Sequence, residues 1–212
     1  MKQRNTDIDW IRAILIILMI LIHIVSFGNA YPQLKAGILS FMMPTFLIIT
    51  GYLVNIEKTG KQMRNYLKCL ALPYVIMETG FSVLSYFMPV RDGITELSLS
   101  QICEKIFVTS IGPYWFIQTM IICGALYYFC FHGRNWNDLR KNYTKRDTYA
   151  SLFVFAVTLL LISETPALSA SAAAYYFIGV VIRQSKMEWS KLFRNEFFAI
   201  FLWIYLLYRN DW

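Results

Sequence analysis

The sequence predicts an all-α fold, a polytopic bundle of about seven transmembrane helices with the N-terminus inside. Composition is the first reason: 57% of the 212 residues are hydrophobic and only 16% are charged, whereas a soluble domain carries about 25% charged residues. The second reason is that the apolar residues fall in long runs. About 20 apolar residues span the hydrocarbon layer of a bilayer, so the lipid bilayer is the partner that these runs require.

Seven apolar segments are candidates for these crossings, taken in chain order. The first four have full spanning length, the next two are short, and the seventh is barely long enough to cross. The predicted spans are Trp10–Phe27, Gly37–Asn55, Tyr66–Met88, Tyr114–Phe131, Thr148–Ile162, Ala167–Ile182 and Glu196–Tyr208.

The distribution of Lys and Arg predicts the orientation of the bundle. If the N-terminus is cytoplasmic, the inside segments hold 16 of these residues and the outside segments hold 4, namely Lys35, Arg91, Lys105 and Arg209. Cytoplasmic loops are the ones enriched in positive charge. Topology therefore explains the net charge of +7, and we expect no nucleic-acid partner because no basic helix or RNA-binding motif accompanies it.

A signal peptide and a metal site are the two alternatives that the sequence raises. The segment Trp10–Ala30 has the basic start and apolar run of a cleaved signal peptide, but Arg12 and His23 interrupt the run. The four cysteines show no CxxC or His/Cys spacing, which would indicate a metal site. We therefore expect an uncleaved first span, no disulfide and no metal.

Arg12 and His23 are the leading candidates for function. They are eleven residues apart, which places them within about 20° of the same helix face and about 16 Å apart along the axis. Charged groups inside a span are costly and mark functional sites by default. Arg12 could bind phosphate or carboxylate at the cytoplasmic mouth, and His23 could accept a proton from a hydroxyl. The alternative is that Arg12 reaches the interface and His23 bonds a neighbouring helix.

Glu78 in the third span is the third candidate catalytic residue. A carboxylate in hydrocarbon requires a polar partner, so structural pairing is as good an explanation as catalysis. Gln118 and Glu164 are weaker candidates, and Pro44 and Thr50-Gly51 of the second span are interpreted as kink and close-packing positions.

These residues form a pattern that resembles the acyltransferase-3 family of integral membrane acyltransferases. Asp7 through His23 resembles the start of that family, with an acidic residue, an Arg, ten intervening residues and a His. Ser40 through Leu53 is similar to its Phe-x-Met-Pro…Ser-Gly-Tyr stretch, with Met42 in place of a common His and Thr50 in place of Ser. A basic segment ending at Pro73-Tyr74 and the segment Gly112-Pro-Tyr-Trp-Phe-Ile follow in the family's order.

Two features depart from the family's pattern. The basic segment usually carries paired arginines, and here Cys69 stands where an Arg is expected, so the resemblance assigns phosphate contacts to Arg64 or Lys68. The family has about ten helices and about seven are predicted here, so we expect one acyltransferase-3-like domain over residues 1–212 that is incomplete at its C-terminus.

The resemblance implies an O-acyltransferase of a bacterial cytoplasmic membrane. It would move an acyl group, most often acetyl, from cytoplasmic acyl-CoA to a hydroxyl of an extracytoplasmic carbohydrate or polysaccharide, with acyl-CoA as a donor substrate and no permanently bound cofactor. Arg12 with Arg64 or Lys68 would bind the donor, and His23 would be the base or the acyl carrier. The alternatives are a non-enzymatic transporter of a glycan or small anion, for which no repeat or broken helix was found, and a structural membrane subunit.

Overall fold

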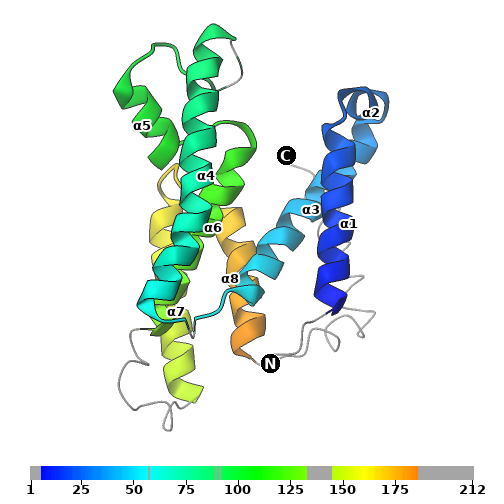
Figure 1. Ribbon diagram of the computed structural model, residues 1–212. Helices are drawn as coiled ribbons and strands as arrows, with labels where there is room; N and C mark the ends of the chain where they lie inside the picture. Colours follow the sequence, from blue (N-terminus) through cyan, green and yellow to red (C-terminus); the bar gives the residue numbers. More distant parts are fainter. Residues whose placement is uncertain (1–5, 57, 89, 91, 133–144, 186–212) are drawn as a thin grey trace. The chain divides into compact units, whose positions relative to one another are not determined.

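The computed structural model describes the chain except residues 1–5, 57, 89, 91, 133–144 and 186–212. The described residues form helices and connecting segments, with no strand among them. Figure 1 shows them coloured along the chain. They divide into two compact units: unit 1 contains the described residues up to Leu53 and those from Ile178 onward, and unit 2 contains the described residues from Val54 to Phe177.

Eight α-helices and one short 3₁₀ helix make up the described part of the chain. In order they are α1 (Thr6–His23), α2 (Val25–Ala30), α3 (Pro32–Leu53), α4 (Gly60–Phe87), α5 (Leu99–Phe107), η1 (Gly112–Tyr114), α6 (Trp115–His132), α7 (Lys145–Ser163) and α8 (Ala170–Gln184).

Six of the seven predicted spans correspond to helices, and the seventh, Glu196–Tyr208, lies outside the described residues. The prediction of an all-α fold is confirmed. Among the described residues, α3, α4 and the η1–α6 segment Gly112–Phe131 are long and apolar enough to cross a membrane. The chain is therefore a membrane protein by composition and helix length.

The first predicted span was wrong at both of its ends. The segment Trp10–Phe27 is not one helix, because α1 begins at Thr6 and ends at His23, and α2 follows after Ile24. Ile24 has extended backbone angles, φ −71° and ψ 109°, which no α-helix can accommodate. The apolar run continues across this break, so hydropathy alone does not reveal where the helix ends.

A stripe of apolar side chains holds unit 1 together. Ile8, Leu15 and Ile22 recur every seventh residue on α1 and are at most 3% exposed, because seven residues are close to two full helical turns. This stripe packs against buried residues of α3 and against the last part of α8, in a cluster completed by Ile38, Met42, Ile49 and Ile182.

Gly179 allows α8 and α3 to cross at close range within unit 1. A Cβ atom at Gly179 would overlap the carbonyl oxygen of Ile48 and would lie 2.9 Å from the backbone nitrogen of Tyr52. Small residues at such crossings let helix backbones approach in membrane proteins, where van der Waals packing drives association.

Unit 2 is built on α4, with α6 running antiparallel to it. The backbone nitrogen of Ile111, just before α6, donates to Glu78 near the middle of α4. The hydroxyl of Tyr128, near the end of α6, donates to the carbonyl of Lys58 before α4, at 3.0 Å.

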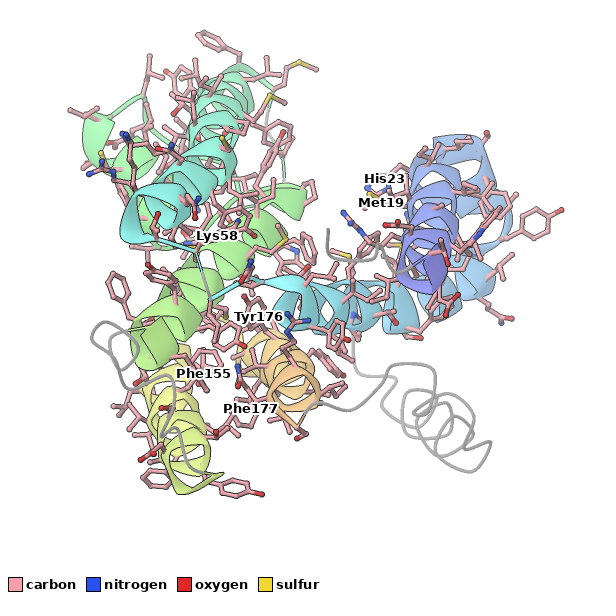
Figure 2. All side chains as sticks on the ribbon, turned by 60° about the horizontal axis from the view of Figure 1, so that its bottom comes forward. Met19, His23, Lys58, Phe155, Tyr176 and Phe177 are labelled. Carbon is pink, nitrogen blue, oxygen red and sulfur yellow. The ribbon has the colours of Figure 1, made fainter. Side chains whose placement is uncertain are left out.

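An aromatic core joins α6, α7 and α8. The ring of Phe155 is centred 5.7 Å from that of Tyr127 and 5.9 Å from that of Phe177. Figure 2 labels Phe155, Tyr176 and Phe177.

We predict that Gly179→Ala destabilises the protein by about 1–3 kcal/mol, the usual cost of overpacking, because the added methyl group would collide with the backbone of α3. Thermal unfolding in detergent micelles, followed by near-ultraviolet circular dichroism, measures the effect. Gly37→Ala is the matched control, since a Cβ atom there meets nothing within 4 Å and Ala is the better helix former. A melting temperature for Gly179→Ala equal to that of Gly37→Ala would contradict the close crossing.

Candidate functional site

Arg12 and His23 lie on α1 in unit 1, beside its buried stripe. Both side chains are exposed, whereas Met19 between them is half-buried. Counting about 100° per residue, Arg12 and His23 fall on the same side of the face formed by Ile8, Leu15 and Ile22. The pairing of the two residues on one face follows from the observed helix, which is continuous from Thr6 to His23.

His23 is the last residue of α1, and the end of the helix determines how its ring is held. Its Nδ1 lies 2.7 Å from the carbonyl oxygen of Met19, one turn earlier, and Figure 2 labels both residues. A carbonyl oxygen only accepts hydrogen bonds, so Nδ1 carries the proton in the neutral ring. The lone pair is then on Nε2, which is the arrangement that a general base or a nucleophile needs.

The first turns of α4 carry a basic face in unit 2. Thr59 caps the helix, since its hydroxyl accepts from the backbone nitrogen of Gln62 at 3.4 Å while the Gln62 side chain accepts from the Thr59 nitrogen at 3.1 Å. Lys61, Arg64 and Lys68 follow at spacings of three and four residues, and all three are exposed. Such spacings place side chains on one helix face.

The positive charges of this face favour the binding of an anion. Like charges three or four residues apart repel each other on a helix, and Lys61 also lies in the first turn of α4, where the helix dipole favours negative charge. A phosphate group on Arg64 and Lys68 would relieve both effects and would gain charge-assisted hydrogen bonds. The face therefore has the chemistry of an anion site on the predicted cytoplasmic side.

Glu78 lies in the interior of α4 and is fully buried beside the connection that leads into α6. Its exposure is 0%, and its Oε1 accepts from the backbone nitrogen of Ile111 at 2.7 Å. The expectation that Glu78 has a polar partner rather than lipid is confirmed. Ile111 directly precedes Gly112, whose φ of +60° suits a glycine, so Glu78 holds the tight turn that begins the Gly112-Pro-Tyr-Trp segment.

Two further side chains hold the same connection, and we call Tyr74, Glu78 and Gln118 the α5–α6 clamp. The Tyr74 hydroxyl donates to the carbonyl of Ile106 at 2.7 Å, and the Gln118 amide donates to the carbonyl of Phe107 at 3.1 Å. The last carbonyls of a helix lack partners within the helix, and these two lie at the end of α5. The clamp therefore supplies the partners that the end of α5 needs.

Polar atoms beside the clamp have bonding capacity left. The second carboxylate oxygen of Glu78, Oε2, is buried and makes no hydrogen bond to a described group, and the same holds for the hydroxyls of Ser82 and Ser110. Glu78 thus holds the turn with one oxygen, and its other oxygen makes no hydrogen bond to a described group. This leaves both sequence-based interpretations of Glu78, structural pairing and catalysis, compatible with its surroundings.

The predicted site residues fall in both units. Arg12 and His23 share α1 in unit 1, while Arg64 and Lys68 share a face of α4 in unit 2, and Glu78 lies nearly three turns beyond Lys68 on α4. Sequence reasoning overlooked Tyr74 as a functional residue, although its spacing of four residues from Glu78 could have placed both on one face.

Comparison with known proteins gives a family match for this chain. A family model described as an acyltransferase domain matches residues 5–208. No curated protein and no solved structure matches the chain.

We predict that Glu78→Ala destabilises the protein by about 1–3 kcal/mol, because it leaves the buried Ile111 N–H without an acceptor. Glu78→Gln retains a side-chain oxygen and is expected to cost less. Denaturant titration of the folded protein in mixed micelles measures both. Glu104→Ala, an exposed carboxylate of the same unit, serves as the control and is expected to stay within about 0.5 kcal/mol of wild type. Equal stabilities for Glu78→Ala and wild type would show that the bond to Ile111 is dispensable.

Proposed function

The chain belongs to the acyltransferase-3 family of membrane acyltransferases, and from this premise we propose that it transfers an acyl group, acetyl in the first instance, from cytoplasmic acyl-CoA to a hydroxyl of an extracytoplasmic carbohydrate. The family match, which covers residues 5–208, carries the reaction class. The predicted orientation supports transfer from a cytoplasmic donor. It places the positively charged side of the protein in the cytoplasm, where acyl-CoA is found. We place the protein in a bacterial cytoplasmic membrane as part of the same proposal.

His23 is the residue to which we assign the chemical step. As a general base, its Nε2 takes the proton of the acceptor hydroxyl while that oxygen attacks the thioester carbon. The new C–O bond forms as the C–S bond breaks, and the coenzyme A thiolate leaves and receives the proton from His23. As an acyl carrier, Nε2 attacks the thioester carbon and the coenzyme A thiolate leaves as the C–S bond breaks. The acceptor oxygen then attacks the acyl-imidazole, the C–N bond breaks, and the released Nε2 takes the hydroxyl proton and passes it to the thiolate. Both routes need the Nε2 lone pair, which the bond from Nδ1 to Met19 makes available.

Arg12, Arg64 and Lys68 are assigned to the donor. Coenzyme A carries phosphates, and a guanidinium binds a phosphate through two parallel N–H donors whereas an ammonium binds it as a point charge. The exposure of all three side chains leaves them accessible to a ligand. Glu78 is assigned to the same enzyme as a buried acid whose Oε2 has no described partner, close to the turn at Gly112.

We predict that His23→Ala lowers the turnover rate about 10²–10⁴-fold, the usual contribution of a general base, while the protein stays folded, because an exposed ring at a helix end contributes little packing. Arg12→Lys is expected to lose less activity than Arg12→Ala, since it keeps the charge but not the bidentate geometry. The measurement is acetyl-CoA turnover with a panel of sugars in proteoliposomes, normalised to folded protein. Gln33→Ala, exposed and in the same unit, is the control. Wild-type specific activity in His23→Ala would exclude both roles for His23.

We also predict that Arg64→Ala and Lys68→Ala each raise the KM for acetyl-CoA about tenfold, which corresponds to a lost interaction of about 1.4 kcal/mol, with little change in kcat. The phosphate-free donor S-acetylpantetheine is expected to show no such increase, because the lost contacts are to phosphate. Lys35→Gln removes a cation that we place on the opposite side of the membrane and serves as the control. An equal rise in KM for both donors would rule out phosphate contacts at these residues.

A further inference from the structure

The helix α5 is amphipathic. At about 100° per residue, its apolar side chains occupy one continuous arc of about 140°. Its polar side chains, Ser100, Gln101, Glu104 and Lys105, occupy the opposite arc. An amphipathic helix in a loop of a membrane protein needs an apolar partner for its whole apolar arc.

Within the part of the chain that the structure describes, one edge of that arc is covered and the other is not. Ile106 is buried and Ile102 is half-buried, on the edge of α5 that packs against α4. Along the other edge Leu99, Cys103 and Phe107 follow one another at four-residue spacing and are exposed, Leu99 by 77% and Phe107 by 70%. We call these three residues the α5 stripe.

Hydrogen bonds hold α5 in this orientation along α4. Before α5, the backbone nitrogen of Ile94 donates to the Ser85 hydroxyl at 3.1 Å. After α5, the clamp residues Tyr74 and Gln118 bond the carbonyls of Ile106 and Phe107. Ser85 and Tyr74 are eleven residues apart on α4, or about 16 Å, so α5 lies beside the half of α4 that ends at Phe87, as Figure 1 shows. The clamp prevents α5 from rotating to bury its stripe.

The outer end of α4 carries exposed apolar side chains, as the α5 stripe does. Leu84, Phe87 and Met88 are exposed by 50%, 67% and 63%, and no charged residue stands among them or within the α5 stripe. The end of α4 belongs to a helix long and apolar enough to cross the membrane, so its exposed apolar side chains face lipid. A second copy of the chain is a less suitable occupant of the stripe than lipid. A stable protein interface buries about 800 Å² of each partner, which is more than three side chains of a nine-residue helix provide.

We propose that the α5 stripe, together with Leu84, Phe87 and Met88, is a lipid-binding surface that lies among the acyl chains of the extracytoplasmic leaflet. The helix α5 then lies along the outer half of α4, with its polar arc toward water or protein and its apolar arc in lipid. This assignment does not depend on the acyltransferase reaction. It follows from the orientation of α5 on α4 and from the chemistry of its two arcs.

The native cysteine of the stripe provides the test. With Cys69, Cys123 and Cys130 replaced by alanine, Cys103 is labelled with the environment-sensitive fluorophore NBD, and the protein is reconstituted in phosphatidylcholine vesicles. Glu104→Cys in a Cys103→Ala background is the matched control, one residue away on the polar arc, and Leu99→Cys in that background is a second reporter on the stripe. Retention of the fold is checked by size-exclusion chromatography before reconstitution.

The proposal predicts a blue-shifted emission at positions 103 and 99, with quenching by lipids that carry a shallow nitroxide at least threefold stronger than at position 104. Aqueous iodide is expected to show the reverse order. Equal iodide quenching at positions 103 and 104 would overturn the proposal and place the stripe in water. Protection at positions 103 and 99 that disappears on dilution of protein in lipid would overturn it in favour of contact between two copies.

Discussion

Backbone groups at the ends of helices need hydrogen-bond partners, and hydrocarbon supplies none; unit 2 is arranged around this requirement. The chain leaves α5 beside the middle of α4 and must turn into α6 there, which exposes two carbonyls and one N–H. Tyr74, Glu78 and Gln118 are the side chains that bond them. These polar residues sit inside otherwise apolar spans because they complete the backbone of another segment.

The clamp also explains why one buried acid can serve two purposes. A carboxylate offers two oxygens, and a single backbone N–H occupies only one of them. Glu78 uses Oε1 for Ile111, and its Oε2 remains with the Ser82 and Ser110 hydroxyls as buried polar atoms. A buried polar atom is costly without a partner, so a water or ligand hydroxyl that bonded Oε2, which has no partner among the described residues, would stabilise this region.

In unit 1 a side chain also bonds a backbone group near the end of a helix. At the end of α1 the carbonyl of Met19 lies within reach of the ring of His23 one turn later. This helix carbonyl orients the ring of His23 and selects its tautomer. In many catalytic sites a carboxylate has that role toward the histidine.

The sequence by itself determined the helical class, six of the helices in approximate place, and the family to which the chain belongs. Those features depend on local composition, since the thickness of a bilayer dictates the length of an apolar run, and on ordered motifs such as Arg12 with His23. It also contained a signal that went unused, the capping box of Thr59 and Gln62, which starts α4 six residues before the predicted span.

Only the tertiary structure decided what the polar residues of the spans contact. The partner of Glu78 is a backbone nitrogen 33 residues away, and no periodicity along α4 or α6 encodes that pairing. The same holds for α5. The sequence shows that one arc of the helix is apolar and the other polar. The bonds from Tyr74 and Gln118 to its last carbonyls decide which edge of the apolar arc meets α4 and which edge remains exposed. Local patterns specify which faces are apolar, whereas long-range packing chooses the neighbour of each face.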